Sequence, residues 1–272
     1  MNRSLSVAGL MVMALMLLFP TLVGAAPPAP VGKLVFEDDF SDPNKSKLEN
    51  NIGAQDYSRG FHAPGVYHLK DVKPGETHWS ILPNQSYANG TVEIDAYDNS
   101  DSFTGDVAQG LLFRAQDATH FYAVLIDPRT GKYTVRKLNG AGKWTDLIAP
   151  KASTLIKKLS DINHLRIDAV DDSFTIYLNG ESLDSFSDAA YKKGGVGLIA
   201  SNVDANGMHM HFDNLKIYSS DATAAGSSNV AGTPKPGTLP NTGDSSAIAA
   251  PWLVLCGLAL LLFGLKLRRT HT

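Results

Sequence analysis

The sequence has almost no cysteine and little excess charge of either sign. Its only cysteine, Cys256, lies in an apolar run near the C-terminus, so no disulfide can cross-link the rest of the chain. The 24 Lys+Arg and 27 Asp+Glu residues give a formal net charge of −3, which argues against nucleic acid as a partner. With 43% hydrophobic residues, the 272-residue chain can bury a sizeable core without cross-links.

The sequence also lacks the usual motifs of nucleophilic and metal-dependent hydrolases. It contains neither G-x-S-x-G nor H-E-x-x-H, and it has no thiol outside the C-terminal run. The glycines of 194–197 lead into an expected strand rather than a helix, so they do not form a phosphate-binding loop. These absences favour a non-enzymatic role, although they leave carboxylate chemistry open.

The N-terminus has the composition of a secretory signal peptide. Arg3 precedes an apolar run over 5–19, and the small residues of 23–25 fit cleavage after Ala25. We therefore expect residues 1–25 to be removed and the protein to be exported. An uncleaved anchor is the alternative, although the run is short for a membrane span.

The C-terminus carries three segments in a fixed order. Residues 239–243 read Leu-Pro-Asn-Thr-Gly, residues 247–265 form an uncharged apolar run long enough to span a membrane, and residues 266–272 are basic. This order resembles the LPxTG sorting signal of sortase-anchored bacterial surface proteins. The resemblance implies that a sortase cysteine attacks the carbonyl of Thr242 and that Thr242 is joined to the cell envelope. The residues it would recognise and cleave are Leu239, Pro240, Thr242 and Gly243. A plain transmembrane anchor that is never cleaved is the alternative.

Two short segments separate these ends from one expected domain over 36–218. Residues 26–35 form a proline-rich lead, and residues 219–238 have the Ala, Gly, Ser, Thr and Pro composition of a flexible stalk. Loss of both chain ends removes more basic than acidic residues. The exported domain is therefore more acidic than the whole chain, which suits a neutral or cationic ligand, or a divalent cation, better than a polyanion.

The domain reads as many short strands separated by turn signals. Strands are expected over 91–96, 121–126, 133–138, 144–148, 164–170, 174–178, 196–200 and 208–218. Turn sequences such as Asp171-Asp172 and Asn179-Gly180 lie between them. This pattern predicts an all-β fold, an antiparallel two-sheet jelly-roll sandwich.

Several motifs resemble those of concanavalin A-like jelly-roll domains. They are Phe36–Phe40, Asn89-Gly90, Leu112–Arg114, Leu165–Ile167, Tyr177–Gly180, Gly195–Leu198 and Phe212–Leu215. The set is similar to the laminin G-like and 3-keto-disaccharide hydrolase-type branches of that superfamily. These motifs are mostly structural, so the resemblance implies the fold and leaves the activity open.

One expected strand offers carboxylates of the kind that glycosidases use. Laminarinase-like glycosidases of the same superfamily carry Glu-x-Asp-x-x-Glu, whose outer carboxylates act as nucleophile and general acid. Here Glu93, Asp95 and Asp98 occupy those positions, with Asp98 in place of a glutamate. Alternation puts Glu93 and Asp95 on one face, and a bulge is needed to bring Asp98 to them. We predict no catalytic residues, and retaining hydrolysis by Glu93 and Asp98 is the alternative.

Oxygen-bearing side chains at both ends of the domain suit a structural calcium ion. They are Asp38, Asp39, Asp213 and Asn214. The terminal strands of such jelly rolls commonly pair, which would gather the oxygen ligands that Ca²⁺ needs. Hydrogen bonding at the strand ends is the alternative. His209 and His211 share a face, as zinc ligands would, but the sequence shows no third ligand.

Glycan binding needs flat aromatic faces together with planar hydrogen-bonding groups. The candidates are Arg114, Gln116, Tyr122, Tyr133, Trp144 and Tyr177. Packing in the core or at a sheet edge is the alternative for each aromatic ring. We therefore expect a cell-surface module that binds glycan or mediates adhesion, with sortase, the cell envelope and a glycan as partners. A display domain without a ligand is the other alternative, and the oligomeric state is left open.

Overall fold

The computed structural model describes residues 27–50, 57–62, 65–99, 105–140, 142–202 and 206–221. Within these ranges the chain forms fourteen β-strands, and no helix there is long and apolar enough to cross a bilayer. The strands are β1 (Lys33–Asp38), β2 (Tyr57–His62), β3 (Val66–Asp71), β4 (Thr77–Ile81), β5 (Gly90–Asp98), β6 (Val107–Asp117), β7 (His120–Asp127), β8 (Lys132–Asn139), β9 (Trp144–Ala152), β10 (Asn163–Val170), β11 (Ser173–Leu178), β12 (Glu181–Ser187), β13 (Gly195–Asn202) and β14 (Met208–Ser219).

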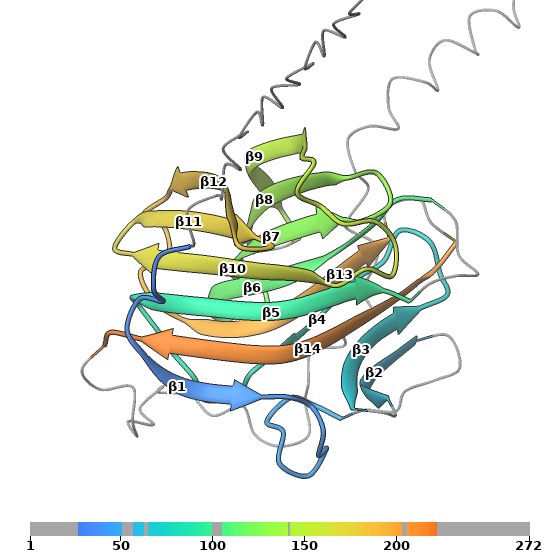
Figure 1. Cartoon of the computed structure of the whole chain (residues 1–272), viewed down its shortest axis with the longest axis horizontal. Coiled ribbons are helices and arrows are strands. Elements are labelled where there is room, and N and C mark those ends of the chain that lie inside the picture. The colour runs from blue at the N-terminus through green and yellow to red at the C-terminus, as the bar shows by residue number, and fades with distance from the viewer. Residues whose placement is uncertain are drawn as a thin grey trace, which may run out of the picture.

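The strands form two antiparallel sheets. The eight-stranded sheet has the order β12-β11-β10-β5-β14-β3-β2, with β1 also paired to β14. The six-stranded sheet has the order β4-β13-β6-β7-β8-β9. Figure 1 looks onto the eight-stranded sheet, where β10, β5 and β14 run side by side across the view. The predicted all-β, two-sheet antiparallel architecture is confirmed.

Alternation of apolar and polar residues explains why these segments form strands. In β5, the side chains of Val92, Ile94 and Ala96 are buried, whereas those of Glu93 and Asp95 are only partly covered. A strand with one face on the core and one toward solvent has this period of two. In β5 this alternation carries Glu93 and Asp95 to the outer face of the sheet.

Turn chemistry sets the hairpins that the sequence predicts. Strands β7, β8 and β9 pair in succession as a meander, and β10 pairs with β11. Between β11 and β12, Asn179 and Gly180 both have positive φ angles of 52° and 87°. Two such residues in a row are typical of the tight turns whose twist matches that of the paired strands.

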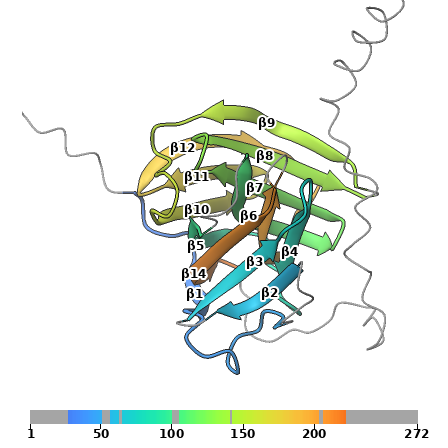
Figure 2. The same ribbon diagram turned by 90° about the vertical axis from the view of Figure 1, so that its right-hand side faces the viewer.

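The core lies between the two sheets. Its largest fully buried side chains include Tyr67, Tyr122, Phe174 and Phe212, which come from strands of both sheets. A second, smaller apolar cluster lies on the other side of the six-stranded sheet, where Phe121 contacts Trp79 and Trp144 edge-on. Figure 2 shows β8 and β9 at the opposite end of the molecule from β1 and β2.

Strand β14 is the organising strand of the eight-stranded sheet. It pairs with β5 along one edge, and with β3 and then β1 along the other. Its register against β5 shifts between Asp213 and Lys216, and Asn214 has a φ of 55°. This irregularity lies near the point where β3 ends and β1 takes its place.

Several predicted segments lie outside the described residues. They are the signal peptide (1–25), all but the first residues of the stalk (219–238), the sorting motif (239–243), the apolar span (247–265) and the basic tail (266–272). At the front of the domain, β1 begins at Lys33, slightly before the expected boundary at residue 36.

The hydroxyl group of Tyr67 links the two sheets. It hydrogen-bonds with Ser80 Oγ and donates to the carbonyl oxygen of Glu49, each at 2.8 Å. The Tyr67→Phe substitution should lower the free energy of unfolding by about 1–2 kcal/mol, because buried partners are left without this hydroxyl. Chemical denaturation measures the change. Tyr218→Phe, at a partly exposed position on β14, is the matched control, and a loss of equal size in both variants would contradict the prediction.

Candidate functional site

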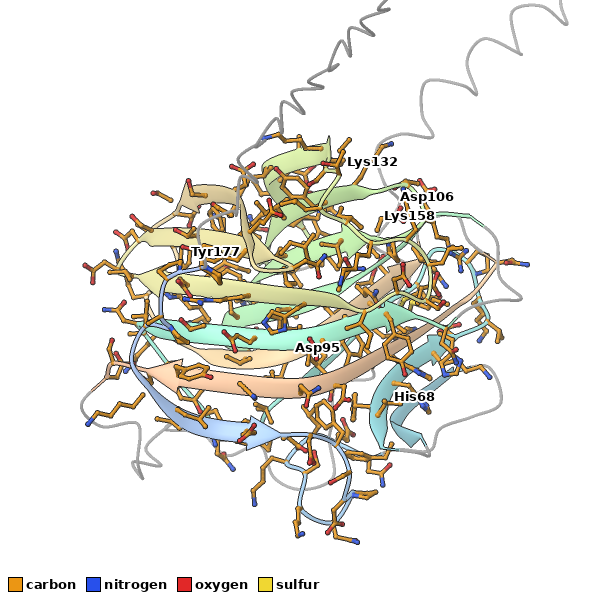
Figure 3. The ribbon with its side chains drawn as sticks, in the orientation of Figure 1. His68, Asp95, Asp106, Lys132, Lys158 and Tyr177 are labelled. Carbon is orange, nitrogen blue, oxygen red and sulfur yellow. The ribbon has the colours of Figure 1, made fainter. Side chains whose placement is uncertain are left out.

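The outer face of the eight-stranded sheet carries a band of ionisable and aromatic side chains from four neighbouring strands. Figure 3 shows Asp95 near the middle of this face and Tyr177 toward one end. We call the band the polar face, and its residues are Glu93, Asp95, Tyr97, His164, Arg166, Tyr177 and Asn214. The alternation in β5 and β10 puts the residues of these two strands on the side opposite the core. Tyr177 is the register partner of Arg166, and Asn214 hydrogen-bonds to Asp95.

Asp95 is the centre of the polar face. Its Oδ1 lies 2.7 Å from His164 Nδ1, and its Oδ2 accepts a hydrogen bond of 3.0 Å from Asn214 Nδ2. Asp95 and His164 are directly opposite each other in the β5–β10 pairing, so the strand register holds this contact. The result is a carboxylate fixed between an imidazole and an amide, with the His164 side chain 42% exposed to solvent.

The two charged partners hold each other ionised. Burial raises the pKa of the Asp95 carboxyl, but the hydrogen bonds from His164 and Asn214 outweigh burial and leave this pKa below its usual value. The hydrogen bond to Asp95 raises the pKa of the His164 imidazole, although burial opposes the change. In this pair the protonated imidazole can donate hydrogen bonds and the carboxylate can accept them, on the same surface.

Arg166 orders the neighbouring part of the polar face. Its guanidinium donates to both carboxylate oxygens of Asp168, at 2.8 and 2.7 Å, and lies 5.0 Å from the centroid of the Tyr177 ring. It also donates to the carbonyls of Pro28 and Ala29, at 2.7 and 3.1 Å. The N-terminal lead therefore covers Arg166, while His164 is left exposed.

The structure separates the carboxylates that the glycosidase alternative requires. Strand β5 alternates regularly, so Asp98 points to the face opposite Glu93 and Asp95. Its side chain is 3% exposed and forms an ion pair of 2.8 Å with Arg129. The irregularity that could have moved Asp98 lies in β14 instead. The alternative in which Glu93 and Asp98 act as a catalytic pair is therefore wrong. The next residue of β5 on the polar face is Tyr97.

Three of the side chains that the sequence predicted to bind glycan are bonded within the fold. Tyr122 is fully buried, and its hydroxyl donates to Asp188 at 2.6 Å. Tyr133 is buried as well and donates to Asp184 at 2.5 Å. Arg114 is 2% exposed and donates to the carbonyls of Tyr191 and Ala88 at 3.0 and 2.8 Å. These side chains are buried, so the prediction that they bind glycan is wrong.

The other three lie at the surface, on different parts of the molecule. Gln116, near the end of β6, donates to the carbonyl oxygens of Arg114 and Lys193. Trp144 lies at the rim of the apolar cluster on the six-stranded sheet, with the Arg136 guanidinium 5.0 Å from its ring centroid. Tyr177 belongs to the polar face. The structure does not bring these three together.

The predicted calcium ligands lie close to one another at the irregular part of β14. Strands β1 and β14 pair as expected, and Asp38 is the register partner of Leu215. Burial raises the pKa of Asp213, and the charges of Asp95, Asp39 and Asp38 raise it further. The groups also bond locally: Asp38 accepts from the Phe40 N–H at 2.9 Å, and Asp39 from the Ser41 hydroxyl at 2.7 Å. Calcium binding by these residues stays a prediction.

Sequence reasoning missed His164 and Arg166 as parts of the site. The signal was present, because Leu165, Ile167 and Ala169 point to the core and leave the residues between them for the other face. Which strand would lie beside β5 was not readable from the sequence. The sorting residues Leu239, Pro240, Thr242 and Gly243 lie outside the described residues.

Comparison with known proteins gives a fold and no family. No family model and no curated protein matches the sequence. Among solved structures, a β-glucanase of Bacillus licheniformis has a TM-score of 0.50 at 13% identity, covering 69% of this chain and 98% of that one. The carbohydrate-binding module CBM66 of Bacillus subtilis has a TM-score of 0.49 at 20% identity, covering 60% and 92%. At such identity, the match to the glucanase shows a shared fold alone.

The Asp95–His164 pair should make stability depend on pH. Because the pKa of His164 is raised in the folded protein, its stabilisation is fully present below the unfolded-state value of about 6.5 and is lost as pH rises through the folded-state pKa. Because the pKa of Asp95 is lowered, its stabilisation is present above its unfolded-state value of about 3.9 and is lost as pH falls through the folded-state pKa. The exposure of His164 limits the effect to less than about 1 kcal/mol.

NMR titration of the His164 ring measures this coupling directly. The wild type should titrate above 6.5, and Asp95→Asn should return the pKa of His164 toward 6.5. Relative to Asp95→Asn, the wild type should lose unfolding free energy as pH rises above 6.5. A wild-type imidazole that titrates at or below 6.5, or that Asp95→Asn does not shift, would contradict the pairing.

Proposed function

We propose that the protein is a cell-surface jelly-roll module that binds a neutral glycan on its polar face. The observation that carries the proposal is the Asp95 carboxylate held between His164 and Asn214, on a solvent-facing sheet surface that also bears Tyr177. The shared fold with a β-glucanase supports it. Adhesion through such a glycan follows from display at the cell surface.

The chemistry of the polar face suits sugar hydroxyl groups. A hydroxyl donates one hydrogen bond and accepts others, and the Asp95–His164–Asn214 group offers both kinds of partner. Tyr177 supplies an aromatic ring, whose face packs against the C–H side of a sugar. The negative charge of the exported domain would repel a polyanion, so the proposed glycan carries no negative charge.

The proposal is one of binding without hydrolysis. A retaining glycosidase needs two carboxyl groups about 5–5.5 Å apart on the same side of the groove. Glu93 and Asp98, the pair that the sequence suggested, face opposite sides of β5, and Asp98 is held by Arg129. The Asp95 carboxylate is held between two partners that stabilise it as an anion, which suits ligand recognition.

Attachment to the envelope is proposed from the two chain ends. The apolar N-terminal run would direct export, and the LPxTG-type signal at 239–243 would pass Thr242 to the envelope. The stalk over 219–238 would hold the jelly roll away from the surface. The support is the order of motif, apolar span and basic tail.

Glycan arrays probed with the full chain test the binding proposal. Asp95→Asn and Tyr177→Ala should each weaken binding by about tenfold or more, because each removes about 1.4 kcal/mol or more of contact energy. Trp144→Ala, on the other sheet, is the matched control and should leave binding unchanged. Loss of binding in Trp144→Ala alone would move the site to the six-stranded sheet, and release of reducing sugar by the wild type would contradict binding without hydrolysis.

A second experiment tests the sorting signal. Incubation of the full chain with a sortase and a glycine-based amine should give a product that ends at Thr242 joined to the amine, as mass spectrometry can detect. Leu239→Ala should lower the yield by about tenfold or more, if burial of this side chain in the enzyme contributes about 1.5–3 kcal/mol. Ser245→Ala, just beyond the motif, is the control. A chain that is never cut between Thr242 and Gly243 would contradict the proposal.

A further inference from the structure

Three histidines converge on the outer face of the eight-stranded sheet, at the end near β3. His209 and His211 come from β14, and His68 comes from β3, where it is the direct register partner of His211. One ring nitrogen from each histidine can be chosen so that all three lie within 4.8 Å of one another. Figure 3 shows His68 on the same side of the sheet as Asp95. We call these three residues the histidine cluster.

The spacing within the cluster is that of metal ligands. Nε2 of His211 lies 3.0 Å from Nε2 of His209. Two nitrogens bound to one tetrahedral zinc ion at about 2.0–2.1 Å lie about 3.3 Å from each other. The His209 and His211 rings are nearly perpendicular, at 88°, and their centroids lie 4.5 Å apart. A small shift of either ring would place both nitrogens at coordinating distance from one ion.

A neighbouring side chain orients the most buried member of the cluster. Nδ1 of His211 lies 2.9 Å from the Tyr97 hydroxyl, and His211 is 4% exposed. When Nδ1–H donates to Tyr97, the lone pair of Nε2 points toward His209. Metal-binding histidines are generally held in this way through the nitrogen that does not bind the metal. Tyr97 therefore acts as a positioning residue.

We propose that the histidine cluster binds a divalent transition-metal ion of the zinc class through His68, His209 and His211. Imidazole nitrogens suit Zn²⁺, Co²⁺, Ni²⁺ and Cu²⁺, whereas Ca²⁺ and Mg²⁺ prefer oxygen ligands. Three protein ligands leave a fourth position of a tetrahedral ion for water or an added ligand. His68 and His209 are only partly buried. The site is distinct from the predicted calcium ligands, which are oxygen donors.

Zinc binding to the purified full chain tests the proposal. After treatment with a chelator and its removal, isothermal titration with Zn²⁺ should show one site, and His68→Gln and His209→Gln should each weaken it by at least about tenfold. Both substitutions are at partly buried positions, so they test the site without removing the buried His211. His120→Gln, at an exposed histidine paired with Asp117, is the matched control and should bind as the wild type does.

The visible absorption of bound Co²⁺ is a second measurement, which reports the coordination geometry of the ion. Co²⁺ bound to the wild type should show the intense visible absorption of a four-coordinate ion, and His68→Gln should lose it while its circular dichroism shows a folded protein. A wild type that binds neither Zn²⁺ nor Co²⁺ would overturn the proposal. Zinc binding that is equally tight in His68→Gln, His209→Gln and the wild type would overturn it too, because the metal would then lie elsewhere. Glycan binding is measured separately, so failure of one proposal does not imply failure of the other.

Discussion

The pairing of β14 with three other strands is the constraint on which the site depends. One edge of β14 follows β5, and the other follows β3 and then β1, so residues distant in sequence become neighbours at fixed positions. Because strand side chains alternate, a slip of one residue would exchange the core and solvent faces. The buried side chains of Met210 and Phe212 make such a slip costly, and they thereby hold His211 on the outer side. Asn214 reaches Asp95 on that side because the register of β14 shifts between Asp213 and Lys216.

Residues of similar chemistry have different roles in the core and on the polar face. Arg114, Tyr122 and Tyr133 have side chains of the kind that bind sugars. Arg114, however, donates to backbone carbonyls, and the two tyrosines donate to the carboxylates of Asp188 and Asp184. A buried polar group has to be satisfied within the protein, which removes it from ligand binding. Asp95 and His164 satisfy each other while the imidazole stays in contact with solvent.

The same strands bring two kinds of chemistry to one surface. Tyr97 contacts His211 of the histidine cluster, and on the same strand Asp95 bonds to His164. A metal ion held by imidazoles and a hydroxyl-rich ligand held by a carboxylate would therefore occupy neighbouring parts of the outer face. Toward the other end of the face, Arg166 bonds to the N-terminal lead and lies beside Tyr177.

The sequence by itself determined the fold class, because period-two alternation and turn residues such as Asn179-Gly180 are local signals. It also determined that β1 and β14 would pair, from the resemblance, and that Glu93 and Asp95 would share a face. Only the tertiary structure decided that Asp98 is turned inward, that His164 lies opposite Asp95, and that His68 joins His209 and His211. The physical reason is that alternation fixes the side to which a residue points, whereas the neighbouring strand is chosen by packing across the whole sheet.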